Sequence, residues 1–222
     1  MVVDVLNDPG GREQLLRLGV RKVPVVAKGD RFVFGQLLEQ VARFVGLAGT
    51  GQQKLPPEDL VPRYRAILEA AQRLIAQVPD ERINERVIPN RDRTVRLLCH
   101  HMFRIAESFI EAWDGAEYTA EFHGLPPAAD IRTARQLVAY GDAVRARFDA
   151  WWDRVEDRSC RKTLATYFGP CPAHDLLERS TWHTAQHCRQ LADVLTRFGI
   201  TPDRPLTPEQ LAGLPLPERL YE

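Results

Sequence analysis

One stretch of the sequence, from Ala173 to Phe198, contains neither glycine nor proline and therefore predicts a long helix. His183 and His187 lie four residues apart in this stretch, and positions i and i+4 fall on the same face of a helix. Two imidazoles on one rigid face are half of a transition-metal site. The alternative is that one histidine is hydrogen-bonded in the core while the other lies at the surface. Apolar residues indicate that much of the helix is buried: Leu176, Leu177, Leu191, Val194, Leu195 and Phe198.

Length and charge balance narrow the class of protein. A chain of 222 residues, 44% hydrophobic and 27% charged, is long enough for one large or two small domains, and a change of pattern near Thr50 favours two. Because 30 Lys and Arg balance 30 Asp and Glu, no net charge attracts nucleic acid or an anionic membrane. We therefore expect neither nucleic acid nor membrane as a partner.

A membrane-spanning segment or a signal peptide in the sequence would indicate the cellular location of the protein. No apolar run approaches the ~20 residues that span a bilayer, and Met1 to Asp4 shows no basic or apolar segment of a signal peptide. We expect a cytoplasmic protein, whose thiols are reduced by default. No CxxC motif is present, so spacing predicts neither a zinc knuckle nor a redox pair among Cys99, Cys160, Cys171 and Cys188.

Residues 1–47 alternate between strand and helix signals. We expect a strand over Val2–Leu6, a helix over Arg12–Leu18, a hairpin joining 23–26 to 31–34, and a helix over Leu37–Val45. The stretch from Gly19 to Val26, followed by the hairpin and by Phe34-Gly35-Gln36, resembles the second half of a glutaredoxin or thioredoxin-like domain.

That resemblance implies a role for one proline. Pro24 matches the cis-proline that borders the thiol-binding groove in this family, which makes Pro24 a candidate substrate-binding residue. The first strand and the CxxC helix of the family are absent, so disulfide exchange by this segment is unsupported. We interpret residues 1–47 as a partial glutaredoxin-like segment, either a decayed accessory domain or one whose start codon is placed too late.

The remainder of the chain has helical periodicity. Residues 48–58 are rich in Gly, Gln and Pro and are predicted to be a linker. Residues 59–199 predict a four-helix bundle, with helices over 60–78, from Asp92 to Trp113, over 131–155 and over 173–198. Residues 200–222 are a Pro-rich tail, expected to be coil with one turn near Glu209. The predicted fold class is mainly α, with a small α/β segment of partial thioredoxin-like fold at the N-terminus.

A catalytic metal needs a third protein ligand and an open coordination position. In the second predicted helix, His101 shares an apolar face with Leu97, Leu98 and Ile105, whereas His100 shares its face with arginines and Glu107. His101 is therefore the better inward-pointing candidate. The alternatives are that His101 is a core histidine bonded to a backbone carbonyl, and that His100 is solvated or supports a ligand.

These histidines carry a second family resemblance. A histidine in the second helix of a four-helix bundle, followed by HxxxH in the fourth, resembles the DinB-like superfamily of metal-binding bundles, which includes thiol-dependent S-transferases. The match covers roughly Leu60 to Gly199. The phrases HMFR at 101–104 and TWHTAQH at 181–187 are similar to a subgroup that pairs this bundle with a glutaredoxin-like part. The resemblance implies a metal triad of His101, His183 and His187, and an association as a homodimer.

The implied activity is transfer of a low-molecular-weight thiol, such as glutathione, mycothiol or bacillithiol, to a small electrophile. A divalent metal on three neutral imidazoles lowers the pKa of a bound thiol, and the thiolate is a strong nucleophile. Zinc or nickel is expected first, with iron and manganese as alternatives. Arg104 and Arg189 are candidates to bind a carboxylate of the thiol, although solvated charge is the default role of each.

Two other functions remain open. A metal-dependent hydrolase would use a metal-bound hydroxide with Glu107 or Glu178 as base, although both are more commonly surface charges. A non-catalytic bundle would bind metal or only dimerise. Among the other residues, Cys188 is predicted to be a packed thiol, Cys171 to be structural or a favoured thiolate near a helix start, and His174 not to be a ligand. Trp151, Trp152 and Trp182 are predicted to be core or dimer contacts.

Overall fold

The computed structural model describes the chain except residues 1–2, 4, 6–7, 49–52, 90–91 and 222. The chain divides into two compact units, Met1–Gln52 and Gln53–Glu222. The strand expected over Val2–Leu6 falls largely on residues outside this description, and the described Val3 and Val5 lie in no strand.

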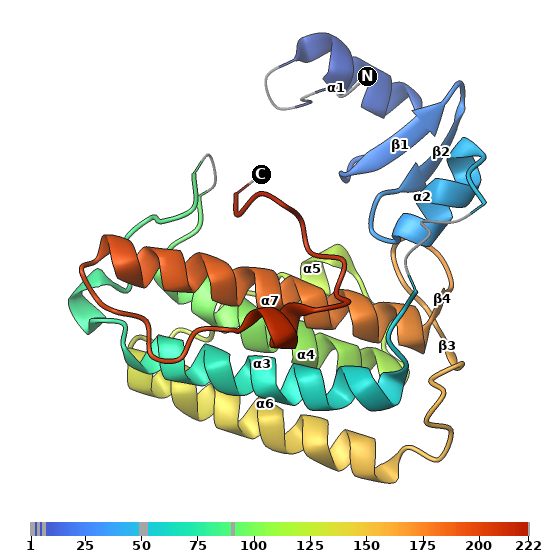
Figure 1. The fold of residues 1–222 in the computed structure, drawn as a ribbon. Coiled ribbons are helices and arrows are strands. Elements are labelled where there is room, and N and C mark those ends of the chain that lie inside the picture. The colour runs from blue at the N-terminus through green and yellow to red at the C-terminus, as the bar shows by residue number, and fades with distance from the viewer. Residues whose placement is uncertain (1–2, 4, 6–7, 49–52, 90–91, 222) are drawn as a thin grey trace. The chain divides into compact units, whose positions relative to one another are not determined.

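The described residues of the first unit form a hairpin and two helices (Figure 1). Helix α1 (Pro9–Arg17) begins after Asp8, whose side chain accepts a hydrogen bond from the Gly10 N–H at 2.9 Å. Strands β1 (Val25–Lys28) and β2 (Arg31–Phe34) pair antiparallel through a turn at Gly29, where φ is +61°. Helix α2 (Leu38–Val45) ends at Gly46 in the left-handed conformation. The Val23–Pro24 peptide bond is cis, as the glutaredoxin resemblance implies, while the thioredoxin-like assignment itself stays a prediction.

The second unit is a four-helix bundle, so the chain is mainly helical, as the DinB-like resemblance implies (Figure 1). Its helices are α3 (Pro57–Ala76), α4 (Val95–Trp113), α6 (Ala134–Arg154) and α7 (Ala173–Arg197). Helix α3 begins inside the predicted linker, because Pro57 suits the first helical position and Glu58 and Asp59 favour the positive end of the helix dipole. Helix α6 begins later than expected, at a capping box formed by Thr133 and Gln136.

Each bundle helix packs against two others. Helices α3 and α4 each pack against both α6 and α7 and make little contact with each other. They therefore occupy diagonally opposite positions in the bundle. Phe103 of α4 faces Gly141 of α6, and Asp114 pairs with Arg154 further along both helices, so α4 and α6 run parallel. Parallel neighbours require a connection that returns along the bundle. Residues 114–133 make this return and contain the short helix α5 (Ala120–His123).

Aromatic side chains fill the bundle core. Tyr64, Phe109, Phe148 and Trp151 are fully buried, and Tyr64 packs edge-on against Phe148 with ring centroids 5.0 Å apart. The Tyr64 hydroxyl lies 3.1 Å from the hydroxyl of Thr184 on α7, which satisfies two buried polar groups. Trp151 and Trp152 are core residues, which is one of the two roles predicted for them.

Short elements complete the unit. They are a 3-10 turn, η1 (Asp80–Arg82), the paired strands β3 (Thr163–Leu164) and β4 (Cys171–Pro172), and helix α8 (Pro208–Leu211). Helix α8 is the turn expected in the tail, and it packs against α3, where Arg63 donates to the Glu209 carbonyl at 3.1 Å. No helix among the described residues is long and apolar enough to cross a membrane.

Candidate metal centre

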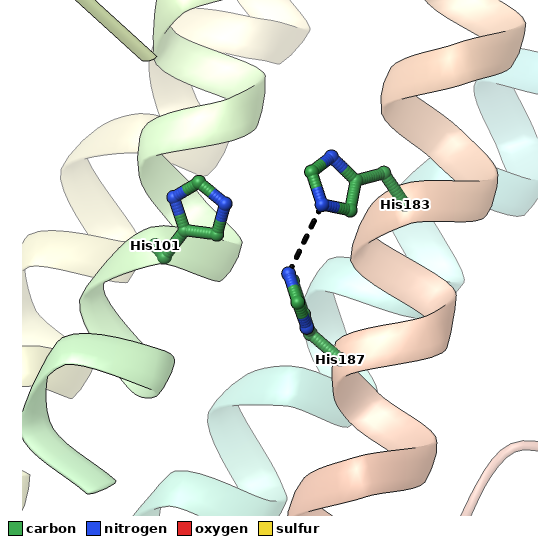
Figure 2. A group of neighbouring side chains, drawn as sticks. All are labelled: His101, His183 and His187. Carbon is green, nitrogen blue, oxygen red and sulfur yellow. Dashed lines mark hydrogen bonds between the residues drawn. The ribbon is translucent and has the colours of Figure 1, made fainter. Parts of the chain in front are cut away.

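Three histidines from two helices meet in the bundle. His101 projects from α4, and His183 and His187 project from successive turns of α7 toward it (Figure 2). One nitrogen from each ring can be chosen so that all three lie within 4.8 Å of one another. The Nε2 atoms of His183 and His187 are 3.1 Å apart. The i,i+4 spacing on α7 and the inward face of α4 therefore bring together the three residues that the sequence singled out.

The spacing of these nitrogens suits a bound metal. In a tetrahedral zinc site with Zn–N bonds of about 2.0–2.1 Å, ligand nitrogens are roughly 3.3 Å apart. The two Nε2 atoms on α7 already have close to this separation. All three rings are at least partly buried, with His101 and His187 more than nine-tenths so. The donor set fits a divalent metal that accepts imidazole nitrogen, such as zinc, nickel, iron or manganese.

Gln190 fixes the tautomer of His187. The side-chain nitrogen of Gln190 donates to the carbonyl of Leu220 at 2.9 Å, which orients its oxygen toward His187. That oxygen accepts from Nδ1 of His187 at 2.7 Å. Since Nδ1 carries the proton, Nε2 of His187 presents its lone pair to the other two histidines. Sequence analysis did not single out Gln190, although its position one turn after His187 was a usable signal.

A cavity of about 160 Å³ adjoins the histidines. His183 and His187 form part of its wall. The rest of the lining comprises Ile88, Arg93, Arg179, Trp182, Gln186, Gln190, Pro217, Leu220 and Tyr221. Trp182, interpreted above as a core or dimer contact, is thus a cavity residue. The space is too large for a single water and small enough for part of an organic molecule.

The C-terminal segment covers one side of this cavity. Gln186 donates to the carbonyls of Arg219 and Leu220, and the Tyr221 hydroxyl donates to Asp193 at 2.7 Å. The tail was expected to be coil with one turn, and none of its residues was predicted to belong to the site. Helical periodicity could not predict this contact, because the segment accepts hydrogen bonds from Gln186 through backbone carbonyls, which every residue carries.

His100 corrects the expectation of a solvated side chain. It is buried, and its ring stacks on Tyr140 of α6 with centroids 4.7 Å apart. Burial lowers its pKa to about 4, so it is neutral at physiological pH. His100 therefore lies at the α4–α6 contact, whereas the triad lies between α4 and α7.

Arg104 is held by carboxylates of its own helix. Its guanidinium pairs with Glu107 at 2.8 Å and Glu111 at 2.6 Å. Glu107 also accepts from Tyr140 and Arg147. Neither Arg104 nor Glu107 lines the cavity beside the histidines. The spacing of Arg104 from Glu107 and Glu111, three and seven residues, already favoured this structural role.

Arg189 and Pro24 are the other predicted substrate residues. Arg189 donates to the side-chain oxygen of Gln186 and to the carbonyl of Pro217, so it supports the covering segment. Pro24 belongs to the first unit, and its contact with a thiol stays a prediction. His174 hydrogen-bonds the carbonyl of Leu55 at 2.8 Å and is no member of the histidine group, as expected.

The cysteines are not activated nucleophiles. All four are free and buried. Burial raises the pKa of Cys171 and of Cys188 to about 12, so both are thiols at neutral pH. Burial and the nearby carboxylate of Asp175 raise the pKa of Cys171 more than Lys54 and Arg179 lower it, which argues against the thiolate alternative.

Comparison with known proteins gives a distant structural resemblance. No family model and no curated protein matches the chain. A crystal structure of the mycothiol-dependent maleylpyruvate isomerase has 21% sequence identity and a TM-score of 0.42, covering 62% of this chain and 61% of that one. A mutant of that isomerase has 17% identity and a TM-score of 0.40, covering 66% and 62%. The chain thus spans about three-fifths of the length of these structures, and their activity does not transfer to it by similarity alone.

Proposed function

We propose that the protein is a metal-dependent enzyme that activates a low-molecular-weight thiol for transfer to a small electrophile. His101, His183 and His187 would hold the metal. The observation that carries the proposal is the convergence of three imidazole nitrogens from α4 and α7 beside a cavity. Three neutral nitrogen donors leave a coordination position open for a reactant, which is the arrangement of catalytic rather than structural zinc sites.

The chemistry divides between metal and protein. A divalent ion bound to the triad would supply a Lewis acid that lowers the pKa of a thiol. The chain's own residues hold His187 in the tautomer that offers Nε2, through Gln190, and shield the reactants from water with Ile88, Trp182 and Leu220. All four of its own cysteines are buried, and burial raises the pKa of each thiol, which supports a small-molecule thiol as the nucleophile.

The hydrolase alternative is less well supported. Glu107 is engaged by Tyr140, Arg104 and Arg147, and Glu178 does not line the cavity. Among the described residues of the lining there is no carboxylate to serve as a general base. The non-catalytic alternative predicts metal binding without turnover and is separated from the proposal by the assay that follows.

The test is a conjugation assay on the reconstituted full chain. Protein loaded with zinc or nickel is incubated with glutathione, mycothiol or bacillithiol and with an aryl halide, an epoxide or an unsaturated carbonyl compound. We expect metal-dependent consumption of at least one thiol, lost in His183→Ala and retained in His174→Gln. Metal-loaded protein that conjugates none of these thiols would contradict the proposal. Ester hydrolysis by the same preparation would favour the hydrolase.

A further inference from the structure

Arg179 is a buried cation that pairs with no Asp or Glu among the described residues. It leaves 7% of its surface exposed, yet it lines the cavity beside the histidines. Its Nη1 donates to the Tyr118 hydroxyl at 3.2 Å, and its buried Nε finds no hydrogen-bond acceptor in the described part of the chain. A buried guanidinium without a counter-charge is costly to keep. The charge of Arg179 is therefore not expected to stabilise the folded protein.

The position of Arg179 relates it to the candidate metal centre. It precedes His183 by four residues on α7, so the two side chains leave the same face of the helix about 5–6 Å apart at Cβ. A second guanidinium, that of Arg93, lies 3.4 Å from Nε2 of His187. No described residue of the lining is acidic. The cavity thus presents the charge of Arg179 with no acidic residue in its described lining, which favours an anion there.

We propose that Arg179 binds a carboxylate of one of the reactants in this cavity. Tyr118 accepts a hydrogen bond from Nη1, and Arg179 lines the cavity, so the remaining donor capacity of the guanidinium can serve an anion bound there. Ile88, Trp182 and Leu220 line the same space, so the ligand class is a carboxylate joined to an apolar or unsaturated body. The inference rests on the proposed function for its claim that the anion is a reactant.

Binding is tested without relying on turnover. Isothermal titration calorimetry with benzoate, succinate and glutathione is run on metal-free and zinc-loaded parent, Arg179→Met and Arg65→Gln, with benzamide as the uncharged probe. Arg65 pairs with Asp149 on the α3–α6 side and serves as the matched control. We expect Arg179→Met to weaken at least one carboxylate about 10- to 100-fold, and Arg65→Gln to leave affinity unchanged.

The pattern of loss identifies the source of the carboxylate. Loss confined to glutathione assigns it to the thiol, and loss confined to benzoate or succinate assigns it to the electrophile. Equal affinities of parent and Arg179→Met for all three, or no binding at millimolar concentrations, overturn the inference. Binding that depends on Arg179 in a protein that never takes up metal upholds the anion site and rejects the proposed function instead.

Thermal unfolding tests whether Arg179→Met weakens binding directly or only destabilises the fold. Because no described Asp or Glu pairs with Arg179, Arg179→Met is expected to melt at the same temperature as the parent or higher. Carboxylate should raise the melting temperature of the parent and not that of the variant. A large drop in melting temperature for Arg179→Met, without any carboxylate effect on the parent, would make Arg179 a structural residue.

Discussion

Nδ1 of His187 donates to the side-chain oxygen of Gln190 at 2.7 Å, and this bond connects the candidate metal centre to the C-terminal segment. The connection exists because the amide nitrogen of Gln190 donates in turn to the Leu220 carbonyl. A hydrogen bond of this kind orients a ligand ring and raises its basicity.

Removing that support should weaken metal binding. We expect Gln190→Ala to lower zinc affinity about 10- to 100-fold, as loss of a partner to a ligating histidine does elsewhere. Competition with a chromophoric chelator measures the change. Gln186→Ala is the matched control, since Gln186 also donates to Leu220 but has no hydrogen bond to a histidine of the triad. Equal affinity in parent and Gln190→Ala would count against this role.

The carboxylate of Glu107 should make stability sensitive to acid. Burial alone would raise its pKa, but hydrogen bonds from Tyr140 and Arg104 outweigh burial and lower it. Unfolding returns the pKa to its ordinary value near 4.3, so the unfolded chain binds more protons as the pH falls. The contribution of Glu107 is therefore present above about pH 5 and is lost progressively below it.

Urea unfolding at several pH values tests this expectation. The parent should lose stability between about pH 5 and pH 3 more steeply than Glu107→Gln, which has no proton to gain. Glu69→Gln, at a half-exposed ion pair with Arg145, should keep the slope of the parent. Parallel curves for parent and Glu107→Gln would refute the role of this network in acid sensitivity.

Gly141 should be intolerant of a side chain. A Cβ at this position would lie 2.4 Å from Cζ of Phe103, where α6 meets α4. Alanine improves helix propensity by about 1 kcal/mol, but overpacking a core costs about 1–3 kcal/mol. We expect Gly141→Ala to be net destabilising in a denaturant titration. Adding Phe103→Leu should recover part of the loss, and an additive double variant would show that the two sites do not interact.

The sequence predicted the bundle and the triad for the same reason. Helical periodicity determines which residues share a face, and that rule placed His183 beside His187 and turned His101 inward. The same rule would have found Arg179, one turn before His183, and Gln190, one turn after His187. Both were passed over because a polar residue on a helix is ordinarily solvated, and only the packed structure shows that these two are buried.

Other features depended on tertiary contacts that no local pattern encodes. His100 was expected on a charged face, but Tyr140 of a different helix covers it. The C-terminal segment joins the cavity through the carbonyls of Pro217, Arg219 and Leu220 and through the Tyr221 hydroxyl. The sequence pattern also could not predict that α4 and α6 run parallel, since four helices in a chain permit several bundle topologies.

Metal content measured by elemental analysis tests the central claim most directly. The parent, His101→Ala, His183→Ala and His174→Gln are purified, reconstituted with a divalent metal and desalted together. We expect close to one equivalent of metal in the parent and in His174→Gln, because the His174 ring bonds the Leu55 carbonyl and lies outside the histidine group, and a loss in both alanine variants. Retention of metal in His101→Ala would remove His101 from the ligand set, and a parent without metal would contradict the account.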